Sequence, residues 1–141
     1  MVSVLIWIKH LTLATVGGFT YTCIELLFRQ RTHYSMFIVG GILFLLIGLI
    51  NEFYTWETPL WKQGLIAAGI ITVMEYVAGL LFNIWLKMDV WDYSGQFCNL
   101  QGQICLLFSF LWIWVGLFAI FLDDTIRWLL FKEEKPHYKI F

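Results

Sequence analysis

Two glutamates lie within long apolar stretches of the sequence, and they are the residues whose placement could support chemistry. Glu75 lies near the middle of an apolar run from about Trp61 to Leu86. That run is long enough to cross a bilayer, since a spanning helix needs roughly 20 mostly apolar residues. A carboxylate at that depth costs at least about 2.5 kcal/mol in a lone helix, so Glu75 is expected to face protein or water rather than lipid. Glu25 lies in an earlier run and can pair with Arg29 at i+4.

The residues around Glu75 recur at helical spacing and therefore share one helix face. The small and polar positions on this face are Ala68, Thr72, Glu75, Gly79 and Asn83. Small residues on such a face allow membrane helices to approach closely. Thr72 and Asn83 could therefore belong to a packing seam. Alternatively, together with Glu25 and Glu75, they border a polar interior or substrate path.

The longest loop, residues 87–102, is the second concentration of polar side chains. Its candidate residues are Trp91, Asp92, Tyr93, Ser94 and Asn99. One interpretation is a connector that caps the fourth span through Asn99 or Gln101. The other is a re-entrant segment or lid that presents these side chains at the mouth of the bundle. An enzyme would need Glu75 with Asp92 or Asp89 as general acid and base, because proton transfer works over hydrogen-bond distances or through one water.

Other arrangements that carry chemistry are not evident. The three histidines are scattered over loops and ends, and the three cysteines match no zinc or redox spacing. We therefore predict no metal site and no cofactor, and we assign no residue a catalytic role. The net charge of -1 gives no general attraction to nucleic acid, so nucleic acid is not an expected partner.

Composition assigns the chain to the membrane proteins. Apolar residues make up 60% of the sequence and charged residues only 13%, whereas about a quarter of a soluble domain is charged. Hydropathy predicts one transmembrane domain over 1–141, an all-α integral membrane bundle of four transmembrane helices. The predicted spans are about 11–28, 35–54, 61–86 and 103–122. A short interfacial C-terminal segment, 123–141, begins with Asp123-Asp124-Thr125, which reads as a helix cap.

Four spans place both termini on one side of the bilayer. That side carries more lysine and arginine than the other, so counting by the positive-inside rule favours cytoplasmic termini in a cell membrane. Four thin helices enclose little interior alone, so we expect a homo-oligomer in the lipid bilayer.

The loop and the span after it also carry a family resemblance. The segments Trp91-Asp92-Tyr93-Ser94 and 99–105, followed by an apolar span with Trp112, resemble the bacterial putative ABC-transporter type IV membrane protein family. The resemblance covers most of the chain and implies a small polytopic, permease-like protein. It also implies a separate ATPase or transport subunit as a partner. The chain itself has no Gly-x4-Gly-Lys-Ser/Thr nucleotide loop.

Three functions are consistent with these residues. The first is a transport component or channel-like protein with the buried carboxylate in its polar interior, which we prefer. The second is an intramembrane enzyme acting on a lipid or isoprenoid. The third is a membrane scaffold or accessory subunit in which the polar groups only hold helices together.

Overall fold

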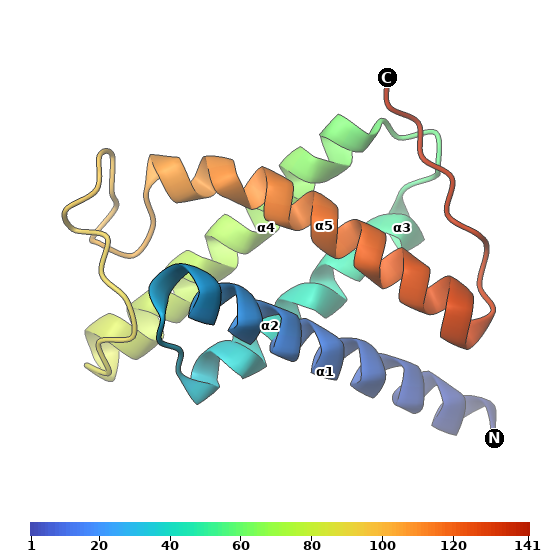
Figure 1. Ribbon diagram of the computed structural model, residues 1–141, viewed down its shortest axis with the longest axis horizontal. Helices are drawn as coiled ribbons and strands as arrows, with labels where there is room; N and C mark the ends of the chain where they lie inside the picture. The colour runs from blue at the N-terminus through green and yellow to red at the C-terminus, as the bar shows by residue number, and fades with distance from the viewer.

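Four long helical stretches form the protein in the computed structural model, which describes residues 1–141 (Figure 1). The elements are α1 (Val2–Arg29), α2 (Tyr34–Gly48), α3 (Ile50–Phe53), α4 (Leu60–Gly79), the π-helix η1 (Leu80–Trp85) and α5 (Leu106–Phe131). With α3 continuing α2 and η1 continuing α4, four helices are long and apolar enough to cross a membrane. The predicted all-α bundle with four transmembrane-length helices is confirmed.

The first and last helices are longer than the spans predicted from hydropathy. α1 begins at Val2 and α5 continues to Phe131. The predicted helix cap at Asp123 is wrong, because α5 passes through it without a break. The Asp123 carboxylate pairs with Arg127 one turn later at 2.7 Å, and the Thr125 hydroxyl donates to a backbone carbonyl one turn earlier at 2.6 Å. Asp123 and Thr125 therefore make these contacts along the helix rather than at its start, and the second Asp123 oxygen, Oδ1, is buried without a hydrogen-bond partner.

The bundle has two ends of different character. The segments 30–33 and 86–105 lie at one end, which we call the loop end (Figure 1). Both termini and the segment 54–59 lie at the opposite end, which we call the terminal end (Figure 1). α1 packs mainly on α2, and α4 packs mainly on α5.

Glycines permit these close helix pairs. A Cβ added at Gly41 of α2 would lie only 2.7 Å from the backbone oxygen of Ala14 in α1. A Cβ added at Gly116 of α5 would lie 2.6 Å from the Cβ of Ala67 in α4. Packing between membrane helices depends on van der Waals contact, because lipid is as apolar as the side chains it replaces. The missing Cβ atoms therefore set how closely the helices approach.

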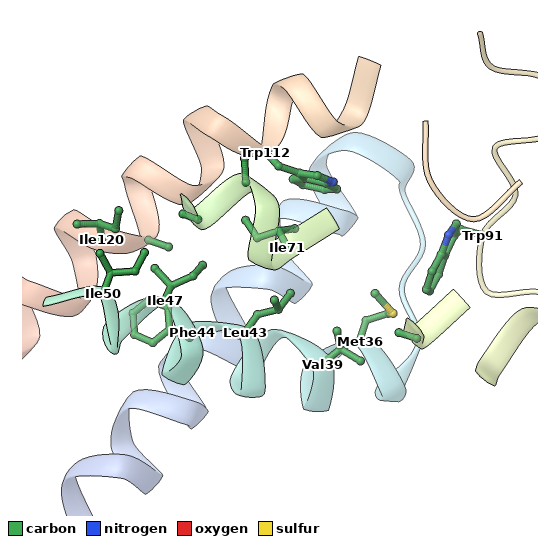
Figure 2. Packing of buried hydrophobic residues seen from close by; sticks show 14 of the residues in the cluster. Met36, Val39, Leu43, Phe44, Ile47, Ile50, Ile71, Trp91, Trp112 and Ile120 are labelled. Atoms are coloured by element: carbon green, nitrogen blue, oxygen red, sulfur yellow. The ribbon is translucent and has the colours of Figure 1, made fainter. Parts of the chain in front are cut away.

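A layer of aliphatic side chains fills the centre of the bundle. Its members are Leu43 and Ile47 from α2, Ile71 from α4 and Ile120 from α5, each at most 4% exposed (Figure 2). Ile71 lies one turn before Glu75, and Ile120 lies one turn before Asp123. The layer therefore separates polar groups near the loop end from polar groups near the terminal end.

Replacing Gly41 by alanine tests whether this glycine permits the close packing of α1 on α2. We expect the free energy of unfolding to fall by about 1–3 kcal/mol, since overpacking forces backbone shifts of that cost. Gly69→Ala is the matched control, because an added Cβ there meets nothing within 4 Å. Denaturant titration in detergent micelles measures the free energy of unfolding of both variants. Equal values for the two would contradict the role of Gly41 in helix packing.

Candidate functional site

Glu75 is buried in the bundle interior and both of its carboxylate oxygens are hydrogen-bonded. Its side chain is only 4% exposed. The Tyr93 hydroxyl donates to Oε1 at 2.9 Å, and the Trp112 indole N–H donates to Oε2 at 2.8 Å. The carboxylate on α4 is thereby joined to the loop through one donor and to α5 through the other. Each bond to a charged group offsets about 1.5–3 kcal/mol of the burial cost.

The Tyr93 donor depends on how the loop folds. Its backbone N–H donates to the carbonyl of Gly102 at 2.7 Å, which closes the loop on itself. Gly102 has φ +71°, and an added Cβ there would lie 2.9 Å from the Asp92 carboxylate. The Tyr93 ring stacks on Phe108 with centroids 4.7 Å apart. Burial and then the nearby Glu75 charge raise the pKa of the Tyr93 phenol, so it remains a donor.

Asp92 points away from this centre. It is exposed, and its two oxygens accept from the Ser94 backbone N–H at 2.8 Å and the Ser94 hydroxyl at 3.0 Å. These bonds hold the pKa of the Asp92 carboxyl below its usual range. Asp92 therefore stays ionised and is poorly suited to act as a general acid beside Glu75.

Glu25 forms a second buried centre near the loop end of α1. Its carboxylate pairs with Arg29 at 2.8 Å and accepts from the Thr32 hydroxyl at 3.0 Å. Arg29 also donates to the carbonyl of Val90 at 2.8 Å, which ties the loop to α1. The predicted i+4 pairing of Glu25 and Arg29 agrees with this geometry.

Two cavities meet at the Glu25–Arg29 ion pair. The first, of about 210 Å³, lies between α1 and α5, and we call it the aromatic pocket. Its rings are those of Tyr21, Phe28, Tyr93, Phe108, Trp112 and Trp114. The second, of about 220 Å³, opens at the loop end, and we call it the polar pocket. Its polar residues are Glu25, Arg29, Arg31, Thr32, His33 and Asp89. Both cavities are lined by the ion pair, which therefore separates them.

The aromatic pocket opens toward the surroundings of the bundle. Phe28 at its rim is 79% exposed, and Trp114 is 63% exposed. Both residues lie within membrane-length helices, so we expect the opening to face the bilayer. A ligand could therefore enter it sideways from lipid.

Two other predicted site residues, Asn83 and Trp91, form hydrogen bonds with the loop rather than with Glu75. Asn83 on η1 donates to the Gln103 side chain at 2.8 Å and accepts from the Val90 N–H at 2.7 Å. Trp91 is buried, and its indole N–H donates to the backbone of Gln103 at 2.9 Å. Thr72 is half-buried one turn before Glu75.

Asn99 is exposed and closes a turn within the loop. Its amide donates to the carbonyls of Ser94 and Gln96, and its side-chain oxygen accepts from the Gly102 N–H at 3.0 Å. The alternative in which Asn99 or Gln101 caps the fourth helix is wrong, because α5 follows Cys105 and has no side-chain cap.

Sequence reasoning missed the partner of Glu75 on α5. Trp112 lies inside an apolar run, and its position favoured packing against neighbouring helices. The available signal was chemical, because a buried indole N–H usually needs an acceptor. Glu75 was the charged acceptor inside the neighbouring span.

A polar cluster near the terminal end was also missed. Arg127 donates to Asp123 at 2.7 Å and to Glu52 of α3 at 3.1 Å. Asp123 is 0% exposed. A Cβ at Gly48 of α2 would lie 2.8 Å from both Asp123 and Arg127, so the glycine makes room for the pair. The i+4 spacing of Asp123 and Arg127 was the signal.

Asp124 anchors the C-terminal segment to the same cluster. It accepts from the Asn51 amide and from the Tyr138 hydroxyl at 2.7 Å. Burial, followed by this hydrogen bond, raises the pKa of the Tyr138 phenol. Farther along, the carbonyl of Lys139 accepts from the Leu60 N–H at 2.7 Å. These contacts close the terminal end of the bundle.

Comparison with known proteins identifies one family. The family model described as "Putative ABC-transporter type IV" matches residues 10–139. No curated protein and no solved structure matches the chain. The predicted resemblance to this family is confirmed over nearly the whole chain.

Replacing Tyr93 by phenylalanine removes the hydroxyl that donates to Glu75 and keeps the ring. We expect the free energy of unfolding to fall by about 1.5–3 kcal/mol, since a bond to a charged group is lost. Tyr76→Phe is the control, because its hydroxyl donates to Gln101 at an exposed position. That loss should be about 1 kcal/mol or less. Chemical unfolding in micelles measures both, and equal losses would contradict a dominant Glu75–Tyr93 bond.

Proposed function

Because the chain belongs to the family described as "Putative ABC-transporter type IV", we propose that it is a transport component for an amphiphilic substrate. The substrate would pass between the bilayer and the surface at the loop end. One observation carries this proposal: an apolar cavity open to the bilayer and a polar cavity open at the loop end meet at one ion pair.

The two cavities match the two halves of an amphiphile. Rings and aliphatic side chains line most of the aromatic pocket, which suits a chain or other apolar group. Charged and polar side chains line most of the polar pocket, which suits a headgroup. Glu25 and Arg29 lie in both linings, so movement of this pair would join the cavities. The ion pair is therefore the proposed gate.

A channel along the bundle axis is less well supported. The aliphatic layer of Leu43, Ile47, Ile71 and Ile120 lies between the polar groups at the two ends. Trp112 and Asp123 are also eleven positions apart on α5, which is roughly 16 Å at the rise of an α-helix. A lateral route avoids this layer.

The enzyme alternative needs two acid–base groups at one place. Tyr93, rather than Asp92, contacts Glu75, and the Asp92 carboxylate is engaged by Ser94. The scaffold alternative is favoured by one observation, which is that both Glu75 oxygens are already paired. A scaffold would show no substrate movement, and this separates it from the proposed transport role.

Partners and orientation belong to the same proposal. A homo-oligomer and a separate ATPase subunit remain predictions, as do cytoplasmic termini. The passive exchange of substrate through the lateral route needs neither nucleotide nor ATPase, so it can be measured on this chain alone.

Reconstitution into liposomes tests the proposed route. Three fluorescent single-chain amphiphiles with anionic, neutral and cationic headgroups are incorporated, and their transfer across the bilayer is followed by quenching from outside. We expect the wild-type protein to accelerate transfer of at least one amphiphile over protein-free liposomes. If all three amphiphiles cross protein-containing and protein-free liposomes at the same rate, the transport role is contradicted.

A variant pair locates the route. Leu111→Trp should slow the transfer several-fold, because Leu111 lines the aromatic pocket and a larger ring would narrow it. Leu107→Trp is the control, since Leu107 is an exposed residue of α5 that is not part of the lining. Equal slowing by both substitutions would place the route elsewhere.

A further inference from the structure

The aromatic pocket is richer in rings than an apolar chain requires. The rings of Tyr93 and Phe108 stack with their centroids 4.7 Å apart, and the ring centroids of Phe108 and Trp112 are 6.0 Å apart. On the α1 side, the ring centroids of Tyr21 and Trp112 are 6.4 Å apart. Aliphatic residues would bind a hydrocarbon equally well, whereas clustered aromatic rings also attract cations through their negative faces.

Two of these rings are polarised by Glu75. Tyr93 and Trp112 direct their polar hydrogens at the carboxylate, while both residues also line the pocket. A donor whose hydrogen is held by an anion gains electron density in the rest of its ring, as hydrogen-bonded groups polarise one another. The negative charge of Glu75 therefore increases the electron density of the Tyr93 and Trp112 rings that line the pocket.

The charges around the pocket favour a cation. Glu25 and Arg29 cancel, since they form an ion pair at 2.8 Å. Both donors to Glu75 are neutral, so no hydrogen-bonded cation neutralises this carboxylate when it is ionised. Arg29 is the only cationic side chain in the lining, and it is already bound to Glu25 and Val90. An anionic headgroup would find no free cationic partner there.

We propose that the aromatic pocket binds the headgroup of a lipophilic organic cation, of the quaternary ammonium class. The volume of about 210 Å³ is below the roughly 300–1,000 Å³ of sites that enclose a drug-sized ligand. The pocket therefore takes the headgroup, and the attached chain leaves through the mouth beside Phe28 and Trp114. This deepens the proposed function, on which it rests for the route, by naming the substrate class.

The polar pocket has no net positive charge that would repel such a cation. Arg29 and Arg31 lie there with Glu25 and Asp89, so its formal charges balance when His33 is neutral. A cation leaving the aromatic pocket would therefore meet a region of mixed charge rather than a positive one.

Binding to the protein in nanodiscs of zwitterionic lipid tests the proposal without any flux. Dodecyltrimethylammonium, dodecyldimethylamine oxide and dodecyl sulfate share a chain and differ in headgroup charge. Isothermal titration, with empty nanodiscs subtracted, should give the ammonium compound at least about a tenfold lower Kd than either of the others, a margin of about 1.4 kcal/mol. Equal affinities, or tighter binding of the sulfate, would overturn the proposal.

Variants distinguish the Glu75-polarised rings from the rest of the wall. Glu75→Gln and Trp112→Phe should each weaken binding of the ammonium compound about tenfold or more and leave the amine oxide nearly unchanged. Trp114→Phe is the matched control, because Trp114 lines the same pocket without a hydrogen bond to Glu75, and it should change the Kd much less. Circular dichroism and size exclusion check that each variant is folded. Unchanged binding in folded Glu75→Gln protein would also overturn the proposal.

The binding assay and the transport assay test the cation site and the transport role independently. Selective cation binding without any amphiphile transfer would retain the site and contradict the transport role. Transfer of only the anionic or neutral amphiphile, with no preference for the ammonium compound in binding, would retain the transport role and contradict the cation site.

Discussion

The hydrogen bonds that hold the Glu75 carboxylate are the interactions on which the rest of the site depends. Burying an ion costs several kcal/mol even after the protein relaxes, so an unpaired carboxylate would not persist inside the bundle. Tyr93 and Trp112 each supply one hydrogen bond to the carboxylate. Because these donors come from the loop and from α5, satisfying one side chain of α4 fixes three parts of the chain relative to one another.

The position of the aromatic pocket follows from this constraint. Turning Tyr93 and Trp112 toward Glu75 places their rings along the gap between α1 and α5, where they form one wall of the cavity. Arg29 then anchors the loop to α1 through the carbonyl of Val90 and neutralises Glu25. A separate cluster around Arg127 closes the opposite end, beyond the aliphatic layer. The interior is therefore divided, and the aromatic pocket opens laterally between α1 and α5.

The sequence predicted what depends on local pattern and missed what depends on distant partners. Hydropathy sufficed for four spans, and helical spacing placed Glu75 on an inward face. The extent of α5 was missed because Asp123 and Arg127 lower the hydropathy of the run although they neutralise each other inside the bundle. The pairing of Glu75 with Trp112 joins residues 37 positions apart in sequence, and no local pattern specifies it. The inward turn of Tyr93 depends on the fold of the whole loop.

The indole resonance of Trp112 tests the central claim most directly. A proton–nitrogen correlation spectrum of the protein in nanodiscs resolves the indole N–H groups, and Trp112→Phe assigns the one in question. An indole bound to a carboxylate should resonate well downfield, and Glu75→Gln should move the Trp112 signal upfield while leaving Trp114 nearly unchanged. A Trp112 signal that is unshifted in Glu75→Gln protein would contradict the claim that this carboxylate organises the site.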